Sequence, residues 1–197
     1  KPDLPKDSTG HTQTTALGGY PGEIEKLSLS TLENWLFGAA NILRGPVDQA
    51  DYKTYIFPLL FFKRICDVYD EEYQIALKEA NGNKEEAEFR ENFHFMIPPE
   101  CHWREVRGKT ENVGQALSHA MRCIEKANEG ALAEIFGDAQ WTNKQLFSDQ
   151  LLIDLIEHFS EHDLCNSNVE PDLAGQAYEY LIKKFADLSN KKAGEFY

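Results

Sequence analysis

Apolar residues recur at spacings of three and four along most of the chain after residue 30, which is the period of an amphipathic α-helix. Residues 30–33 begin the first such run and contain the serine and glutamate of a capping box. The glycine and proline at residues 45–46 are helix stop signals. The run therefore predicts a first helix whose apolar face is formed by Leu32, Trp35, Leu36, Ala39, Ile42 and Leu43.

The most apolar run of the chain follows Asp48, which we expect to cap a second and longer helix. Pro58 lies inside this run and should kink the helix or divide it in two, because proline removes a helical hydrogen bond. The glycine and asparagine at residues 82–83 break the segment, and residues 84–91 indicate a short polar helix. We expect the centre of the core to be the stripe Tyr52, Tyr55, Ile56, Leu59, Phe62, Cys66, Tyr69 and Tyr73.

The second half of the chain predicts further helices that are separated by turns. Thr110 is expected to cap a helix over residues 111–128, and Gly130 is expected to stop it. Residues 142–145 have the spacing of another capping box. A helix, or a broken pair of helices, should follow them, with Ser148 as a candidate second cap.

Residues 171–197 predict a final helix followed by a charged stop and a short extended tail. Pro171 suits the first turn of a helix, where its missing N–H costs nothing. Asn190 and Gly194 are stop signals, and residues 194–197 form the tail. The apolar face of this helix is formed by Leu173, Ala177, Tyr180, Leu181, Ile182, Phe185 and Leu188.

No run of residues has the alternation that is typical of a strand, so the predicted fold class is all-α, a helical bundle of roughly six to eight helices. Residues 1–26 are rich in proline, glycine and threonine and predict a flexible leader, with an ordered arm on a neighbouring molecule as the alternative. The helical domain is expected over residues 27–189 and a linker over residues 190–197. Because the chain lacks an initiator methionine, we expect it to be a piece of a longer protein.

The charge of the chain limits the classes of partner. Twenty Lys and Arg residues stand against 33 Asp and Glu, which gives a formal net charge of −13. An acidic chain gains nothing from counterion release on DNA phosphates, so direct DNA binding should be weak. Solubility is the simplest explanation of the acidity, and a DNA mimic or a basic partner are the alternatives. Four widely spaced cysteines and the lack of a long apolar run favour a reduced cytoplasmic protein without a membrane span.

No catalytic constellation is recognisable, since nucleophile elbows, phosphate-binding glycine loops and isolated carboxylate pairs are all missing from the sequence. His158 and His162 have the spacing of metal ligands on one helical face. Ser160 and the nearby acidic residues indicate that the helix frays there, so we expect ordinary surface histidines and no metal site. Residues 93–103 predict an extended loop. Because Ile97 precedes its two prolines, the loop is not the Asn-Pro-Pro-aromatic motif of amino-methyltransferases.

Two separated motifs give the chain a family resemblance. Residues 174–182 (AGQAYEYLI) and 191–197 (KKAGEFY) resemble the junction of type I restriction-modification DNA methyltransferase (M) subunits, where a similar helix leads into a GEFYTP segment. Residues 32–72 resemble the N-terminal pattern of the same subunits. The matching positions there are Asn34, Trp35, Leu43, Arg44, Gly45, Asp48, Tyr52, Lys53, Tyr55, Leu59, Leu60, Phe61, Lys63, Arg64 and Asp67.

The polar members of the N-terminal motif are expected on a solvated surface, away from the apolar stripe. Lys63 and Arg64 follow eight nearly apolar residues. As alternatives to a solvated position, this pair could cap carbonyl groups or contact an acidic partner.

The resemblance implies that the complete protein is a site-specific DNA adenine methyltransferase, which transfers a methyl group from S-adenosylmethionine to the N6 amine of a flipped-out adenine. It implies that Glu195, Phe196 and Tyr197 contact the cofactor, and that the chain stops before the α/β methyltransferase domain and is inactive alone. The implied partners are the specificity (S) subunit, a second M subunit, the restriction (R) subunit, and DNA through the assembled complex. A non-enzymatic helical interaction domain is the alternative.

Overall fold

The structure is a computed structural model that describes residues 26–173, 175–177, 179–180 and 183–184. Within these residues the regular secondary structure is helical, and no strand is formed. The all-α fold class predicted from the sequence is therefore confirmed. The α-helices are α1 (Leu29–Leu43), α2 (Tyr52–Glu79), α3 (Lys84–Ala87), α4 (Trp103–Arg107), α5 (Val113–Ala127) and α6 (Asp149–Phe159). The 3-10 helices are η1 (Gln49–Asp51), η2 (Arg90–Asn92) and η3 (Pro99–Cys101).

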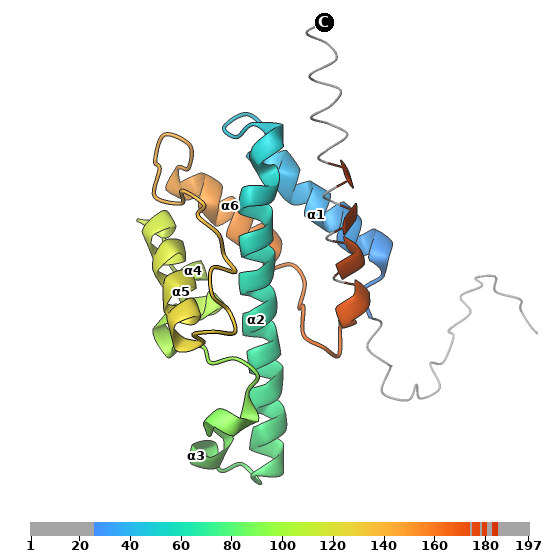
Figure 1. Cartoon of the computed structure of the whole chain (residues 1–197), viewed down its shortest axis with the longest axis vertical. Coiled ribbons are helices and arrows are strands. Elements are labelled where there is room, and N and C mark those ends of the chain that lie inside the picture. The colour runs from blue at the N-terminus through green and yellow to red at the C-terminus, as the bar shows by residue number, and fades with distance from the viewer. Residues whose placement is uncertain (1–25, 174, 178, 181–182, 185–197) are drawn as a thin grey trace, which may run out of the picture.

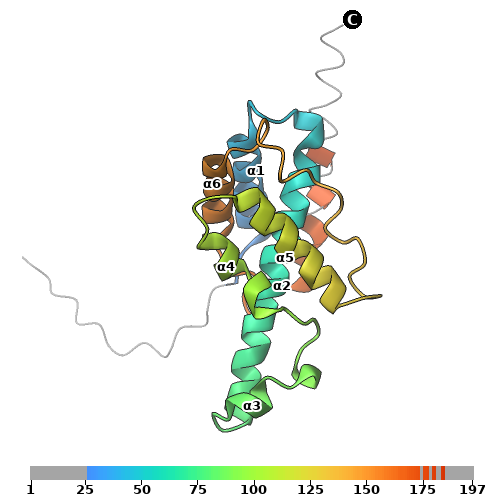
Figure 2. The same ribbon diagram turned by 90° about the vertical axis from the view of Figure 1, so that its left-hand side faces the viewer.

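The 28-residue helix α2 forms the long axis of the molecule, and α1, α4, α5 and α6 form the body around its first half (Figure 1). Helices α1 and α6 contact each other and α2, while α4 and α5 pack together and contact α6. Figure 2 shows α5 crossing α2, with α1 and α6 to one side. The second half of α2 projects beyond this body and carries α3 at its far end.

The described residues among 171–184 are also helical, which agrees with the final helix predicted from the sequence. Ala177 is buried in the main core, and Leu173 and Tyr180 pack against it. In Figures 1 and 2 this helical segment lies beside α1 and α2. The linker predicted over residues 190–197 lies outside the described residues, as does the leader up to residue 25, so both boundaries stay predictions.

The predicted apolar stripes form one continuous core. Ile56, Leu59 and Phe62 of α2 are completely buried, and Leu36 of α1 is almost so. Tyr69 and Tyr73, at the end of the predicted stripe, are only half-buried because α2 leaves the body of the domain there. The long segment between α5 and α6 contains no helix in the structure, but its apolar side chains are buried against the helices. These side chains are Leu132, Phe136, Trp141 and Phe147.

Pro58 does not divide α2, so that part of the prediction is wrong. The helix continues through Pro58 from Tyr52 to Glu79. Proline removes only one donor from the helical ladder. Residues on both sides of it, Tyr55, Ile56 and Leu59, are buried in the same core and hold the backbone helical.

Three helices are capped by residues other than the first predicted caps. Ser28 caps α1 in place of Ser30, since its hydroxyl accepts a hydrogen bond from the Thr31 N–H at 3.2 Å. Ser148, the candidate second cap, begins α6, while residues 142–145 form a turn. Asp149 caps α5 in place of Thr110.

The cap of α5 comes from another helix. The Asp149 carboxylate, in the first turn of α6, accepts hydrogen bonds from the N–H groups of Asn112 at 3.1 Å and Val113 at 2.9 Å. Asn112 has a left-handed backbone with φ 53°, which turns both N–H groups toward α6. A cap supplied from a distant position has no local sequence signal, which explains why Thr110 was predicted instead.

The remaining turns agree with the sequence in part. Asp48 begins the second helical segment by accepting from the Ala50 N–H at 3.1 Å, and η1 then continues into α2. The extended loop predicted over residues 93–103 is only partly right, because residues 93–98 form a loop but η3 begins at Pro99 and α4 begins at Trp103. None of the helices in the described part of the chain is long and apolar enough to cross a membrane.

Candidate functional site

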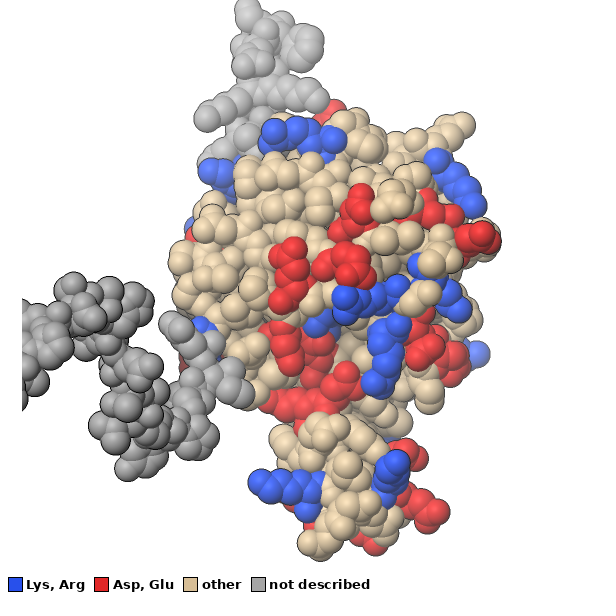
Figure 3. All heavy atoms as spheres, turned by 180° about the vertical axis from the view of Figure 1, so that it is seen from behind, with Lys and Arg blue, Asp and Glu red and all other residues tan. Residues whose placement is uncertain are grey.

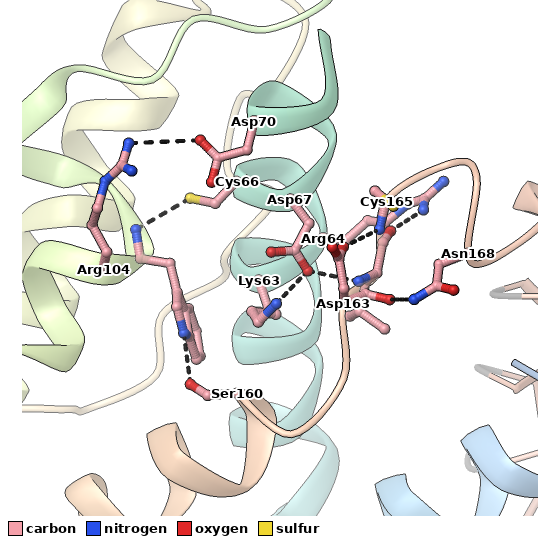
Figure 4. Close-up of polar contacts among 12 residues, drawn as sticks. Lys63, Arg64, Cys66, Asp67, Asp70, Arg104, Ser160, Asp163, Cys165 and Asn168 are labelled. Atoms are coloured by element: carbon pink, nitrogen blue, oxygen red, sulfur yellow. Dashed lines mark hydrogen bonds and ion pairs between the residues drawn. The ribbon is translucent and has the colours of Figure 1, made fainter. Parts of the chain in front are cut away.

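Three charged side chains of α2 bind the loop that leads from α6 into the final helical segment, and a fourth, Lys63, pairs with one of them. Figure 4 labels Lys63, Arg64 and Asp67 of this group. We call this loop, residues 160–170, the exit loop. We call Lys63, Arg64, Asp67 and Glu71 the α2 clamp. Asp67 lies three and four residues after Arg64 and Lys63, and Glu71 lies four residues after Asp67, so these spacings bring the side chains to one side of the helix.

Arg64 makes the largest number of contacts in the α2 clamp. One guanidinium nitrogen donates hydrogen bonds to the carbonyl oxygens of Leu164 and, at 3.5 Å, Val169. The other terminal nitrogen donates to Asn166 Oδ1 at 2.6 Å. Burial lowers the pKa of Arg64, against the raising effect of nearby acidic groups, but an arginine stays protonated at neutral pH. A planar guanidinium thus ties three points of the exit loop to α2.

Lys63 and Asp67 form a buried ion pair one helical turn apart. Their side chains are only 8% and 12% exposed. Asp67 Oδ2 also accepts a hydrogen bond from the backbone N–H of Leu164 at 2.7 Å. Burial raises the pKa of the Asp67 carboxyl, and Lys63 acts in the opposite direction. Asp67 therefore binds the exit loop while Lys63, on the same helix, balances its charge.

Glu71 binds the next part of the exit loop. Its carboxylate accepts hydrogen bonds from the backbone N–H groups of Asn166 at 2.8 Å and Ser167 at 2.9 Å. Burial acts to raise the pKa of Glu71, but the hydrogen bonds from Ser167 and Asn166 outweigh it and lower the pKa. Within the loop, the Asn168 side chain donates to the Asp163 carbonyl at 2.8 Å. The loop is thus fixed both to α2 and to itself.

The exit loop is also joined to the beginning of the domain. The Leu27 N–H donates to the Asn168 carbonyl at 2.9 Å, and Lys26 Nζ lies 2.9 Å from Glu170 Oε1. Leu164 and Val169 are buried and anchor the two ends of the loop in the core. The position of Pro171, and with it the start of the final helical segment, is therefore set by contacts with α2 and with the residues before α1.

An apolar cavity of about 410 Å³ lies between α1, α2 and the final helical segment. Arg64 is the one charged residue among the described residues that line it, at the edge shared with the α2 clamp. Such a lining suits hydrophobic side chains and offers few partners to the charged groups of a cofactor. The other lining residues are Leu32, Leu36, Leu60, Phe61, Leu164, Val169, Pro171, Gly175 and Ala177.

The predicted surface position of the motif residues on α2 is wrong for Lys63, Arg64 and Asp67. Arg64 does contact carbonyl groups, but they belong to the exit loop and not to a helix end as the alternative supposed. Glu71 is not among the residues that the sequence motif marks. A signal was present, since Lys63, Asp67 and Glu71 recur every four residues, but nothing local showed that a loop 100 residues later covers that face.

The structure also places the two predicted surface histidines. His158 Nε2 lies 2.7 Å from the Trp35 carbonyl oxygen, and its ring stacks on the Trp35 ring with centroids 5.9 Å apart. The His162 ring packs edge-on against Trp35 at 5.3 Å. Both histidines are half-buried, so the predicted surface role is wrong because Trp35 of α1 occupies the space between them. The predicted cofactor-binding residues Glu195, Phe196 and Tyr197 lie outside the described residues and stay a prediction.

Comparison with known proteins gives a family for this architecture. The model of the HsdM N-terminal domain matches residues 32–159, which span α1 to α6. The chain is 25% identical over 183 residues to the type I restriction enzyme MjaIX methylase subunit of Methanocaldococcus jannaschii, covering 84% of this chain and 32% of that protein.

A solved structure has the same fold. The crystal structure of the type I restriction-modification system methyltransferase subunit from Streptococcus thermophilus aligns with a TM-score of 0.61 at 22% identity, over 81% of this chain and 39% of that one. The chain therefore spans less than half the length of either relative. Because the family model covers most of the chain, and all the helices α1 to α6, the chain belongs to the HsdM N-terminal domain family.

Proposed function

We propose that this chain is the N-terminal domain of a type I restriction-modification subunit that methylates adenine at N6 in DNA, using S-adenosylmethionine. The family match over residues 32–159 carries this proposal. The target adenine would be flipped out of the duplex to reach the methyltransferase pocket. Glu195, Phe196 and Tyr197 would contribute to the cofactor site, and residues 190–197 would connect the helical domain to the methyltransferase domain. With DNA as the substrate, we expect the activity in the cytoplasm.

In this proposal the helical domain itself is a scaffold. The α2 clamp supports this role, because it fixes the start of the helical segment that leads toward residues 190–197. The described residues contain no group placed for methyl transfer, so we expect the 197-residue chain to be inactive alone. The alternative of a helical interaction domain unrelated to methyltransferases is disfavoured by the family match.

A methylation assay tests the enzymatic part. The complete encoded protein, mixed with its specificity subunit, should transfer labelled methyl groups from S-adenosylmethionine to the N6 position of adenine in duplex DNA. The 197-residue chain in the same mixture should give background labelling. Methyl transfer by the chain alone, or label on cytosine, would contradict the proposal.

The proposed partners are the specificity subunit, a second methyltransferase subunit and the restriction subunit. The end of the molecule that projects from the body supports a role in assembly, because Ile75 of α2 and Phe89, which follows α3, are both 53% exposed. Exposed hydrophobic patches mark interaction sites, and these two are the exposed large hydrophobic side chains of the described residues. Replacing both by aspartate should abolish co-purification with the specificity subunit and leave helix content unchanged. Gln74→Asp on the same exposed stretch is the matched control.

DNA is proposed to bind through the assembled complex. Acidic and basic side chains intermingle on the face shown in Figure 3, and the acidic ones gather across its middle. Together with the net charge of −13, this supports weak direct binding. The 197-residue chain should therefore show no DNA binding at physiological salt in a fluorescence anisotropy titration. Tight binding that falls steeply with salt would contradict this part of the proposal.

A further inference from the structure

A second cluster of reactive side chains lies between η3 and α5, on the opposite side of α2 from the exit loop (Figure 1). It consists of Cys101 from η3 and of His119 and Cys123 from α5. One ligand atom from each, the two sulfurs and a ring nitrogen, lie within 4.8 Å of one another. Cys123 Sγ is 3.5 Å from His119 Nε2 and 3.9 Å from Nδ1.

The backbone holds these three residues in place. His119 and Cys123 are one turn apart on α5 and therefore project from the same face. Cys101 is presented by η3, whose loop is fixed to the end of α5 through Asn128. The Asn128 side chain accepts from the Met96 N–H and donates to the Met96 carbonyl, both at 2.8 Å. The ligand set thus comes from two elements that are already joined.

The burial of the cluster is graded from the core to the surface. Cys101 is completely buried, Cys123 is half-buried and His119 is exposed. An ion could therefore enter from the His119 side and reach a sulfur at the base of the site. Thiolate and imidazole are the ligands that zinc prefers, and two thiolates neutralise the charge of one Zn²⁺ ion.

We propose that Cys101, His119 and Cys123 bind one zinc ion, with water as the fourth ligand. Tetrahedral zinc with bonds of about 2.0–2.3 Å places its ligand atoms roughly 3.3–3.8 Å apart. The cluster meets this spacing after small side-chain rotations, because all three atoms already lie within 4.8 Å. The bound ion would cross-link the η3 loop to α5.

Cobalt is a suitable probe, because tetrahedral Co²⁺ bound to thiolates absorbs strongly by charge transfer. The reduced, chelator-treated 197-residue chain is titrated with Co²⁺ and then with Zn²⁺. We expect one Co²⁺ per chain, a thiolate-to-cobalt band, and loss of that band when zinc is added. Changes to outer-shell residues typically cost about 10- to 100-fold in metal affinity, so loss of a direct ligand should cost at least ~10-fold.

The test uses the variants Cys123→Ser and His119→Gln. Neither side chain is fully buried, so these substitutions should leave the core intact. Both should weaken Co²⁺ binding by at least ~10-fold, and Cys123→Ser should also weaken the charge-transfer band. Cys165→Ser is the matched thiol control and should leave binding unchanged. Circular dichroism checks that each variant keeps its helix content.

Three outcomes would overturn the proposal. The first is a reduced wild-type chain that binds no Co²⁺. The second is binding of equal strength in wild type, Cys123→Ser and His119→Gln. The third is a reduced chain whose melting temperature does not rise when zinc is added, while air oxidation readily forms a Cys101–Cys123 disulfide that does raise it.

Discussion

The guanidinium of Arg64, in the middle of α2, donates a hydrogen bond to the carbonyl oxygen of Leu164, 100 residues further along the chain. Leu164 in turn donates its N–H to Asp67, one turn after Lys63. Both backbone groups of one loop residue are therefore satisfied by charged side chains of a single helix. This arrangement makes the α2 clamp the main determinant of where the exit loop lies.

Arg64→Ala should destabilise the domain by about 2–3 kcal/mol, since hydrogen bonds to a charged group contribute roughly 1.5–3 kcal/mol and buried carbonyls would lose their donor. Arg64→Lys should recover only part of this loss, because an ammonium cannot reach the same three acceptors. Urea denaturation followed by circular dichroism measures the free energy of unfolding. Arg104→Ala, at a side chain that is 67% exposed, is the control and should change it by less than about 0.5 kcal/mol. Equal effects of Arg64→Ala and Arg104→Ala would contradict the role of the α2 clamp.

Breaking the buried ion pair on one side should cost more than removing both partners. Lys63→Met leaves Asp67 without its counterion and is expected to destabilise by about 3–5 kcal/mol. Lys63→Met combined with Asp67→Leu removes both charges, so the double variant should be more stable than Lys63→Met alone. A double-mutant cycle from urea denaturation measures the coupling. Additive effects would show that the two side chains do not interact.

The contribution of Glu71 to stability should depend on pH. Its pKa in the folded protein is below the ordinary value of 4.5, so the folded state binds its proton more weakly than the unfolded state does. The contribution is thus fully present above pH 4.5 and is lost as the pH falls through the folded pKa. Asp67, whose pKa is raised, gives the opposite slope.

Glu71→Gln separates these two effects. The free energy of unfolding of wild type should fall more steeply than that of Glu71→Gln as the pH is lowered from about 6 to about 3. The difference between the two curves isolates Glu71, since Asp67 is present in both. Parallel curves would mean that Glu71 does not hold the exit loop in solution.

Gly114→Ala should be one of the most damaging small substitutions in the domain. A Cβ atom at this position of α5 would lie 2.0 Å from the backbone oxygen of Trp141, which cannot rotate away. We expect a loss of about 2–3 kcal/mol, although alanine favours a helix over glycine by about 1 kcal/mol. Gly108→Ala is the control, because its Cβ would meet the nearest atoms at an ordinary 3.6 Å. Thermal unfolding compares the two variants, and a Gly114→Ala protein as stable as wild type would contradict the close packing of α5 on Trp141.

The sequence predicts the helices of this domain well because each has an apolar face that is readable from local spacing. Leu36, Ile56 and Phe62 were assigned to the core for that reason, and all three are buried. The helix caps and the contacts of the α2 clamp are harder to predict from the sequence. Asp149 caps a helix that begins 36 residues earlier, and Arg64 contacts a loop 100 residues later. Such pairings depend on the packing of elements, which periodicity does not contain.

The same limit applies to the cluster of Cys101, His119 and Cys123. The spacing of His119 and Cys123 on one helix is visible in the sequence, but Cys101 joins them only through the course of the η3 loop. His158 and His162 have the same four-residue spacing and pack against Trp35 instead. Ligand spacing on a helix therefore identifies pairs, and the surrounding fold decides which pair has room for an ion.

The hydrogen bond between Leu27 and Asn168 gives the domain a nearly circular path. The chain enters the folded body beside the point from which it departs into its final helix. A disturbance of the exit loop should therefore loosen residues 26–27 at the same time, so the two segments are expected to open as one cooperative unit in hydrogen exchange. Lys26 and Glu170 therefore lie at one edge of the body, and an event that separates them would release both ends of the described fold together.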